Sequence, residues 1–177
     1  MISMFKHCFK AFILSLLLVG CVVTVPPMSQ NKVKELALLL QSLDRTITHQ
    51  EAMRLSKDIF HHTQKLTEEF ELTSPPQFHN FLVTIGVREK GLCYHWSDAL
   101  YTYLTRKPYP AFEFHLVGAN IGEYFYEHNA LVVTAKGGDI KKGIIIDPWR
   151  DSGSVYYAEI EKDTAYRWVH RPKRGCD

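Results

Sequence analysis

Residues 110–117 have the sequence Pro-Ala-Phe-Glu-Phe-His-Leu-Val, and the spacing of apolar residues changes within them. Phe112, Phe114 and Leu116 stand at every second position, which is the period of a β-strand with one buried face. Before this stretch, apolar residues recur every three or four positions, as in amphipathic helices. Helices followed by strands predict an α+β fold in which an antiparallel sheet packs against the helices.

Two long helices are predicted within residues 31–71. The apolar stripe of the first consists of Val33, Leu36, Leu39, Leu40 and Leu43. Thr48 and Glu51 have the spacing of a capping box, in which two side chains satisfy each other's free backbone N–H groups. We therefore expect the second helix to begin there, with a buried face formed by Ala52, Leu55, Ile59, Leu66 and Phe70.

The remaining elements follow in order along the chain. A short helix is predicted over residues 78–85, and a longer one begins at Cys93 and ends before Pro108. Further strands are predicted at residues 129–135, 143–147 and 154–158, with glycine-containing turns between them. A chain of 177 residues has room for one ordinary domain, which we place at residues 31–177.

Residues 1–20 have the features of an export signal. Lys6 and Lys10 precede an apolar run at residues 11–20, which is too short to cross a bilayer as a permanent helix. The run ends in Leu-Val-Gly-Cys at residues 18–21, which resembles a bacterial lipobox. That resemblance implies removal of residues 1–20 as a lipoprotein signal peptide and acylation of Cys21. An uncleaved anchor and a plain secretory peptide are the alternatives.

Lipidation would make residues 21–30 a tether between the lipid bilayer and the domain. Each buried acyl methylene contributes roughly 0.8 kcal/mol, so several chains on Cys21 anchor a soluble domain durably. The residue after the cysteine is Val22. Many Gram-negative lipoproteins with Asp at this position stay at the inner membrane. Val22 therefore favours the outer membrane, with the domain in the cell envelope facing the periplasm.

Charge argues against a nucleic-acid partner. Without Lys6 and Lys10 the remaining chain has equal numbers of acidic and basic residues, so it is close to neutral. It has no basic cluster of the length that nucleic-acid binding requires. The pairs His61-His62 and Glu68-Glu69 lack the spacing of a metal motif, and a solvated helix face is the better interpretation. We predict no metal and no cofactor.

Gly91-Leu92-Cys93 places a cysteine at the start of a predicted helix. The unpaired N–H groups and partial positive charge of a helix N-terminus favour a thiolate, and they can also stabilise an oxyanion. An isolated cysteine is more often a small buried apolar residue. An exported protein could also pair Cys93 with Cys176, although a disulfide would silence the thiol. We favour a free Cys93.

A histidine and an aspartate stand at the ends of predicted strands. His128 opens the strand at residues 129–135, and Asp147 closes the strand at residues 143–147, directly before Pro148. Neighbouring antiparallel strands can bring the two side chains together. The carboxylate could then accept one imidazole N–H and fix the tautomer of the ring. Cys93, His128 and Asp147 are therefore the predicted nucleophile, base and orienting residue.

This order of motifs, a helix beginning near Gly-x-Cys, then His opening a strand, then Asp-Pro closing the next, resembles the transglutaminase-like superfamily of the papain-like fold. The resemblance spans residues 78–149 and implies catalytic roles for Cys93, His128 and Asp147. The sequence departs from the family pattern at Ala130, where an aromatic residue is common. It also lacks the Gln that papain places before its cysteine, so Asn80 and Tyr94 are candidate oxyanion donors.

The resemblance implies acyl-transfer chemistry at an amide bond of a peptide, a protein or peptidoglycan, carried out by a peptidase, an amidase or, less typically, a transglutaminase. A catalytically silent binding or scaffolding lipoprotein of the same fold is a second hypothesis. A third is a related papain-like group of cell-wall hydrolases with the same Cys-then-His order, but Asp147-Pro148 favours the transglutaminase-like pattern.

Several other residues near these motifs receive structural predictions. His95 is expected on the helix surface or in a cap, pointing away from Cys93. The aromatic residues 124–126 either line a substrate cleft or form a packed patch over a loop. Trp149 is predicted to fill the core, and Tyr156, Tyr157 and Trp168 to pack along a strand and the tail.

Overall fold

The computed structural model describes residues 28–172. The predicted signal peptide, the lipidation site Cys21, most of the tether and Cys176 lie outside the described residues. Two long helices come first, α2 (Gln30–Gln41) and α3 (His49–Glu69). They are followed by the short helix α4 (Pro76–Thr84) and by α5 (Cys93–Thr105). The order of helices is the predicted one.

The start of α3 differs in one detail from the predicted capping box. Thr48 caps the helix, because its hydroxyl accepts the N–H of Glu51 at 3.2 Å. The carboxylate of Glu51 accepts the N–H of Ala111 at 3.2 Å instead of bonding back to the cap. Glu51 therefore ties the beginning of α3 to the segment that leads into the sheet.

The sheet is antiparallel, with the strand order β4-β3-β2-β1-β5. Its strands are β1 (Phe112–Ala119), β2 (His128–Ala135), β3 (Ile144–Asp151), β4 (Ser154–Glu159) and the short β5 (Val169–His170). Short 3-10 helices, η1 (Ile140–Lys142) and η2 (Ile160–Lys162), flank β3 and β4 in the chain. The α+β class with an antiparallel sheet is confirmed. The predicted end of the third strand at Asp147 is wrong, because β3 continues to Asp151 through an irregularity in its pairing with β4.

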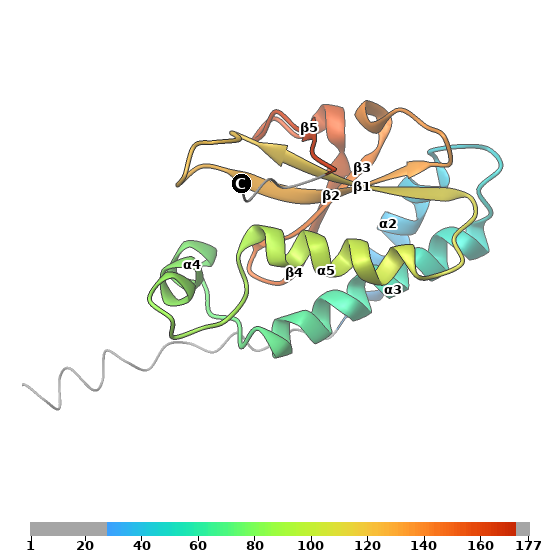
Figure 1. Ribbon diagram of the computed structural model, residues 1–177. Coiled ribbons are helices and arrows are strands. Elements are labelled where there is room, and N and C mark those ends of the chain that lie inside the picture. The colour runs from blue at the N-terminus through green and yellow to red at the C-terminus, as the bar shows by residue number, and fades with distance from the viewer. Residues whose placement is uncertain (1–27, 173–177) are drawn as a thin grey trace, which may run out of the picture.

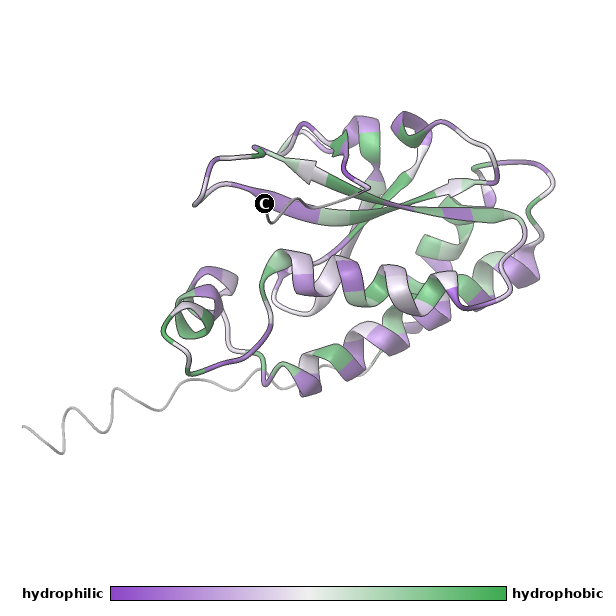
Figure 2. Ribbon diagram, in the orientation of Figure 1, coloured by the Kyte–Doolittle hydropathy of each residue, from purple (hydrophilic) through white to green (hydrophobic). Residues whose placement is uncertain are grey.

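The helices cover one face of the sheet, and α3 and α5 run side by side beneath it (Figure 1). The main core lies between these layers. In Figure 2 the helices are banded by hydrophobic and hydrophilic residues, as expected of helices with one buried side. The predicted buried face of α3 is confirmed, since each of its members is at most 3% exposed: Ala52, Leu55, Ile59, Leu66 and Phe70.

Strand alternation divides the side chains of β2 between two cores. Leu131 and Val133 belong to the main core on the helix side. Ala130 and Val132 belong to a smaller cluster on the opposite face, which Trp168 from the C-terminal segment helps to cover. This division determines which residues at the start of β2 can face the helix α5.

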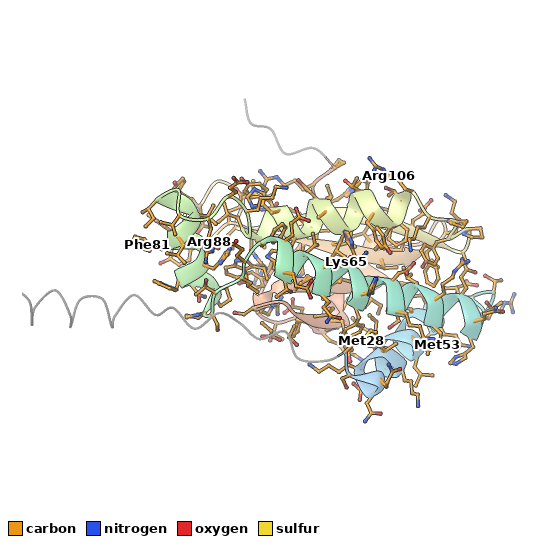
Figure 3. All side chains as sticks on the ribbon, turned by 90° about the horizontal axis from the view of Figure 1, so that it is seen from below. Met28, Met53, Lys65, Phe81, Arg88 and Arg106 are labelled. Carbon is orange, nitrogen blue, oxygen red and sulfur yellow. The ribbon has the colours of Figure 1, made fainter. Side chains whose placement is uncertain are left out.

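The end of the molecule at which α5 begins also holds α4 and the loop between β1 and β2 (Figure 1). Phe81 of α4 is 54% exposed and lies at this end in Figure 3. Residues 124–126 of the loop are exposed aromatics. Within residues 28–172, no helix combines the length and the apolar character needed to cross a bilayer.

Candidate active site

Cys93 is the first residue of α5, and the chain reaches it through an extended Leu92. His95 caps this helix start, because its Nδ1 accepts the N–H of Gly91 at 3.1 Å and that of Leu92 at 3.2 Å. The indole of Trp96 donates to the carbonyl of Gly91 at 3.0 Å. The prediction of a capping or surface role for His95 is confirmed. These contacts fix the direction in which α5 starts, and with it the position of the sulfur.

A buried histidine, His79 of α4, packs against the segment that leads to Cys93. Its Nδ1 accepts the N–H of Thr73 at 3.1 Å, which leaves Nε2 to donate to the carbonyl of Lys90 at 2.9 Å. Gly91 crosses directly over the ring with a φ of +123°, and a Cβ there would lie 2.0 Å from Nε2 of His79. Only glycine satisfies both the backbone angle and the close approach. The sequence analysis did not identify His79.

His128 and Asp147 form a buried pair, with His128 Nε2 2.6 Å from Asp147 Oδ2. Their side chains are 3% and 1% exposed. β2 pairs with β3 so that Leu131 lies opposite Ile146. Continuing this register places Asp147 opposite Ala130 and diagonal to His128. A small residue at position 130 leaves room for the carboxylate, at the position where the family pattern often has an aromatic.

The Cys93 side chain also interacts with the imidazole of His128 and favours its charged form. Because Nε2 faces Asp147, Nδ1 is the ring nitrogen left for the sulfur. Burial of the ring lowers the pKa of His128, but the hydrogen bonds and charges of Asp147 and Cys93 outweigh burial and raise it to about 9. The structure thus brings the three predicted residues together. The arrangement suits a cysteine nucleophile with an imidazolium partner.

A second side chain from β2 reaches the sulfur. Nδ2 of Asn129 lies 3.8 Å from Sγ of Cys93, and Asn129 is only 5% exposed. The sequence analysis treated Asn129 only as part of the strand. The period of two would have found it, because alternation places Asn129 on the same face as Leu131 and Val133, toward α5.

The two predicted oxyanion donors, Asn80 and Tyr94, have contacts with residues other than Cys93. Asn80 of α4 accepts the indole N–H of Trp149 through its Oδ1 at 3.0 Å, which directs its amide to β3. Tyr94 follows Cys93 in α5, and its ring packs against that of His95 with centroids 4.2 Å apart. The amide of Asn129, and not that of Asn80, lies against the Cys93 sulfur.

Asp147 is shared between His128 and a partly buried cation. Arg150 donates its Nε to Asp147 Oδ2 at 3.0 Å. Its terminal nitrogens bind both carboxylate oxygens of Asp163, at 3.1 and 2.7 Å. Burial raises the pKa of Asp163, but Arg150 and the Trp168 indole outweigh it, and the net effect is a lowered pKa. Sequence patterns gave no indication of Arg150 or Asp163, because their pairing depends on the tertiary fold.

Aromatic rings enclose His128. The centroids of Tyr166, Trp149 and Trp168 lie 4.6, 4.8 and 5.4 Å from that of the imidazole. Cys93 is 9% exposed and His128 is 2% exposed. Trp149 packs against an apolar cluster around Trp96, as predicted for a core residue, and it also contacts the site. Trp168 packs as part of the tail, as predicted, and in doing so covers the histidine.

The loop that precedes His128 is not a packed patch. Tyr124, Phe125 and Tyr126 are 86%, 88% and 70% exposed, so the alternative of a packed patch is wrong, while a role in lining a substrate cleft stays a prediction. A separate groove of about 590 Å³ lies between α3 and α5, lined among others by His62, His95 and Arg106. Arg106, which is labelled in Figure 3, directly follows the last residue of α5. Cys93 and His128 are not among the lining residues of this groove.

Comparisons with protein-family models, with curated proteins and with solved structures each gave no match. The candidate site therefore rests on the geometry of its own residues. Within residues 28–172, no group of three or more His, Cys, Asp or Glu side chains is arranged to hold a metal ion.

Proposed function

We propose that this chain is a membrane-anchored exported lipoprotein whose domain is a thiol hydrolase or acyl transferase acting on amide bonds, as a peptidase or amidase. Its core would be of the transglutaminase-like, papain-like kind. The observation that supports this proposal most is the buried His128–Asp147 pair, whose imidazole interacts electrostatically with a free Cys93 at a helix start.

The chemistry follows from the three side chains. The Cys93 thiolate attacks the amide carbonyl, and the new C–S bond forms as the C=O electron pair moves to oxygen. When the intermediate collapses, the C–N bond breaks and the proton of the His128 imidazolium goes to the leaving amine. Water or a second amine then attacks the acyl-Cys93 and gives its proton to His128, and the C–S bond breaks to release the acyl product and restore the Cys93 thiolate and the His128 imidazolium. Asp147 keeps the imidazole oriented and stabilises its charge.

The anchor sets the class of substrate available. If Cys21 is acylated, residues 22–27 connect the lipid to a domain that begins near α2, so the enzyme works close to a membrane. At an outer membrane facing the periplasm, peptides, envelope proteins and peptidoglycan cross-links are the amides at hand. The proposed chemistry needs no metal or cofactor.

A second candidate function is a catalytically silent binding or scaffolding lipoprotein of the same fold. The observation that favours it is the coverage of the site, since Cys93 and His128 are both buried and aromatic rings enclose His128. A catalyst must admit a peptide to this place, whereas a scaffold need not.

The first experiment separates these two functions. The full-length protein in detergent is incubated with iodoacetamide, with a mixture of fluorogenic peptides and with purified peptidoglycan. We expect alkylation of the peptide that contains Cys93, distinguished from that of Cys176 by mass spectrometry, and release of new amino groups from one substrate class; Cys93→Ala should lose both. Asp147→Asn should fold and retain alkylation but lose turnover by about 10³–10⁴-fold, as expected when the histidine loses its orienting carboxylate.

Two results would contradict the enzymatic proposal. Equal labelling of wild type and Cys93→Ala would show that the reactive group is elsewhere. Labelling at Cys93 without release of amines from any of the substrates would favour the silent lipoprotein. The anchor is tested by growing cells with labelled palmitate: wild type should incorporate the label and Cys21→Ala should not.

A further inference from the structure

Asn129 is held in one orientation by two charged neighbours. The guanidinium of Arg171 donates to its Oδ1 at 3.3 Å, and its Nδ2 donates to Glu127 Oε1 at 3.4 Å. A guanidinium can only donate and a carboxylate can only accept, so the amide oxygen must face Arg171 and the NH₂ group must face Glu127. The same NH₂ group lies 3.8 Å from the Cys93 sulfur.

The two charged neighbours are themselves fixed. Arg171 and Glu127 form a short ion pair, and Glu127 Oε2 also accepts the N–H of Gly122 at 3.0 Å. Burial raises the pKa of Glu127, but Gly122, Arg171 and Asn129 outweigh it, and the carboxylate stays charged. The backbone N–H of Arg171 donates to the carbonyl of Leu116 at 2.8 Å, directly after β5 pairs with β1. This hydrogen bond and the ion pair hold Arg171 next to Asn129.

This position is the one that the reaction requires of an oxyanion donor. The carbonyl carbon that binds Sγ carries its oxygen one bond further out. A donor within hydrogen-bond reach of the sulfur can therefore meet that oxygen as it becomes negative. Useful donors lie about 2.7–3.1 Å from the oxyanion.

We propose that Asn129 is the side-chain oxyanion donor of this site, with Arg171 as a positioning residue that keeps its NH₂ group toward Cys93. This inference rests on the proposed acyl-transfer function. In the attacking step, the Asn129 N–H donates a hydrogen bond and transfers no proton. The proton for the leaving group comes from His128, so the two side chains of β2 have separate tasks.

The test compares two reactions of the same sulfur. Acylation by p-nitrophenyl acetate passes through an oxyanion, whereas alkylation by iodoacetamide does not. We expect Asn129→Ala to slow acylation of Cys93 by about 10²–10³-fold, the usual loss for one oxyanion donor. Its alkylation rate should stay within a few-fold of wild type. Asn129→Asp keeps the shape and removes the donor, so it should lose acylation to a similar extent even if the alanine variant folds poorly.

Arg171 is tested in the same assay with a matched control. Arg171→Ala should slow acylation by about tenfold, equivalent to about 1.4 kcal/mol in the barrier, while alkylation is unchanged. Arg171→Lys should recover part of the loss, because lysine can still donate to Oδ1. Arg167→Ala, an exposed arginine in the same segment, should acylate like wild type.

The outcomes separate this inference from the function on which it rests. If wild type is acylated no faster than Cys93→Ala, the proposed function itself is wrong. Acylation that is fast in wild type and equally fast in folded Asn129→Ala and Asn129→Asp overturns the oxyanion role alone. A parallel loss of acylation and alkylation in both variants also overturns it, because Asn129 would then support the thiolate rather than the oxyanion.

Discussion

At the scale of single residues, the site combines a buried imidazole with two groups that favour its charged form. Burial alone would discharge His128. Asp147 at 2.6 Å and the Cys93 thiol reverse that effect and raise the pKa of His128 to about 9. Below that pH, His128 is the imidazolium that a leaving amine needs as its proton donor. Above it, the ring is neutral and cannot donate this proton.

The raised pKa of His128 predicts different pH profiles for two reactions of Cys93. Turnover of an amide substrate should fall as the pH rises through about 9, since protonated His128 is lost. Alkylation by iodoacetamide needs a thiolate but no proton donor, so its rate should not fall over the same range. Both profiles are measured on one preparation between pH 6 and pH 10.5, a range of about four decades in proton concentration.

The control for these profiles is the Asp147→Asn variant. Without the carboxylate charge, the pKa of His128 should drop, and the alkaline limb of any residual turnover should move to lower pH. An amide profile that rises through pH 9 together with alkylation would contradict the assignment of His128 as the proton donor.

Sequence patterns predicted part of this site because of where the residues stand. Cys93 and His128 are the first residues of α5 and β2, and Asp147 directly follows a regular apolar run, so the helix and strand periods locate all three. Arg150 and Asp163 have no such context, and they meet only because β3 and the segment after η2 fold together. Asn129 is an intermediate case: strand alternation gives its face, but not its contact with the sulfur.

At the scale of elements, the position of Cys93 depends on how α5 begins. Gly91 crosses His79 with a φ angle that residues with a Cβ rarely adopt. Asp147 depends in a similar way on an irregular strand, since β3 changes register between Asp147 and Asp151. The sequence suggested a strand end at Asp147-Pro148, because proline cannot donate to a regular ladder. The strand instead passes the proline through this irregularity, which lets Arg150 turn back to the carboxylate.

The helix start can be tested by a pair of glycine substitutions. Gly91→Ala should destabilise the domain by about 3 kcal/mol or more, because it adds a clash with buried His79 to the backbone strain. Gly86→Ala is the matched control: its φ is also positive, at +75°, but a Cβ there meets nothing within 4 Å. It should cost only about 1–2 kcal/mol. The measurement is urea denaturation followed by circular dichroism.

The two glycine variants should also differ in reactivity. At urea concentrations where both are folded, Gly91→Ala should alkylate at a rate different from wild type, because the sulfur is displaced. Gly86→Ala should alkylate like wild type. Equal stability losses in the two variants would show that the contact between Gly91 and His79 does not constrain the helix start.

At the scale of the whole molecule, the C-terminal segment completes a site built mainly by earlier elements. Trp168 and Tyr166 cover His128, and Arg171 reaches Asn129. The class of fold, α+β with helices below an antiparallel sheet, could be predicted because long periodic segments specify it. The closure by the C-terminal segment could not. β5 has only two residues, and their pairing with Val117 and Gly118 leaves no periodic pattern in the sequence.

This closure predicts that access to Cys93 depends on the size of the reagent. In wild type, iodoacetamide should react much faster than its fluorescein derivative, because Cys93 is only 9% exposed and aromatic rings enclose the neighbouring His128. Tyr166→Ala opens the cover beside His128 and should speed the bulky reagent by about tenfold, or about 1.4 kcal/mol. The small reagent should change far less. Tyr124→Ala removes a tyrosine that is 86% exposed and should change neither rate.

If Tyr166→Ala leaves the ratio of the two rates at its wild-type value, the C-terminal aromatics do not control entry, and the substrate must reach Cys93 from the side of α4 and the β1–β2 loop.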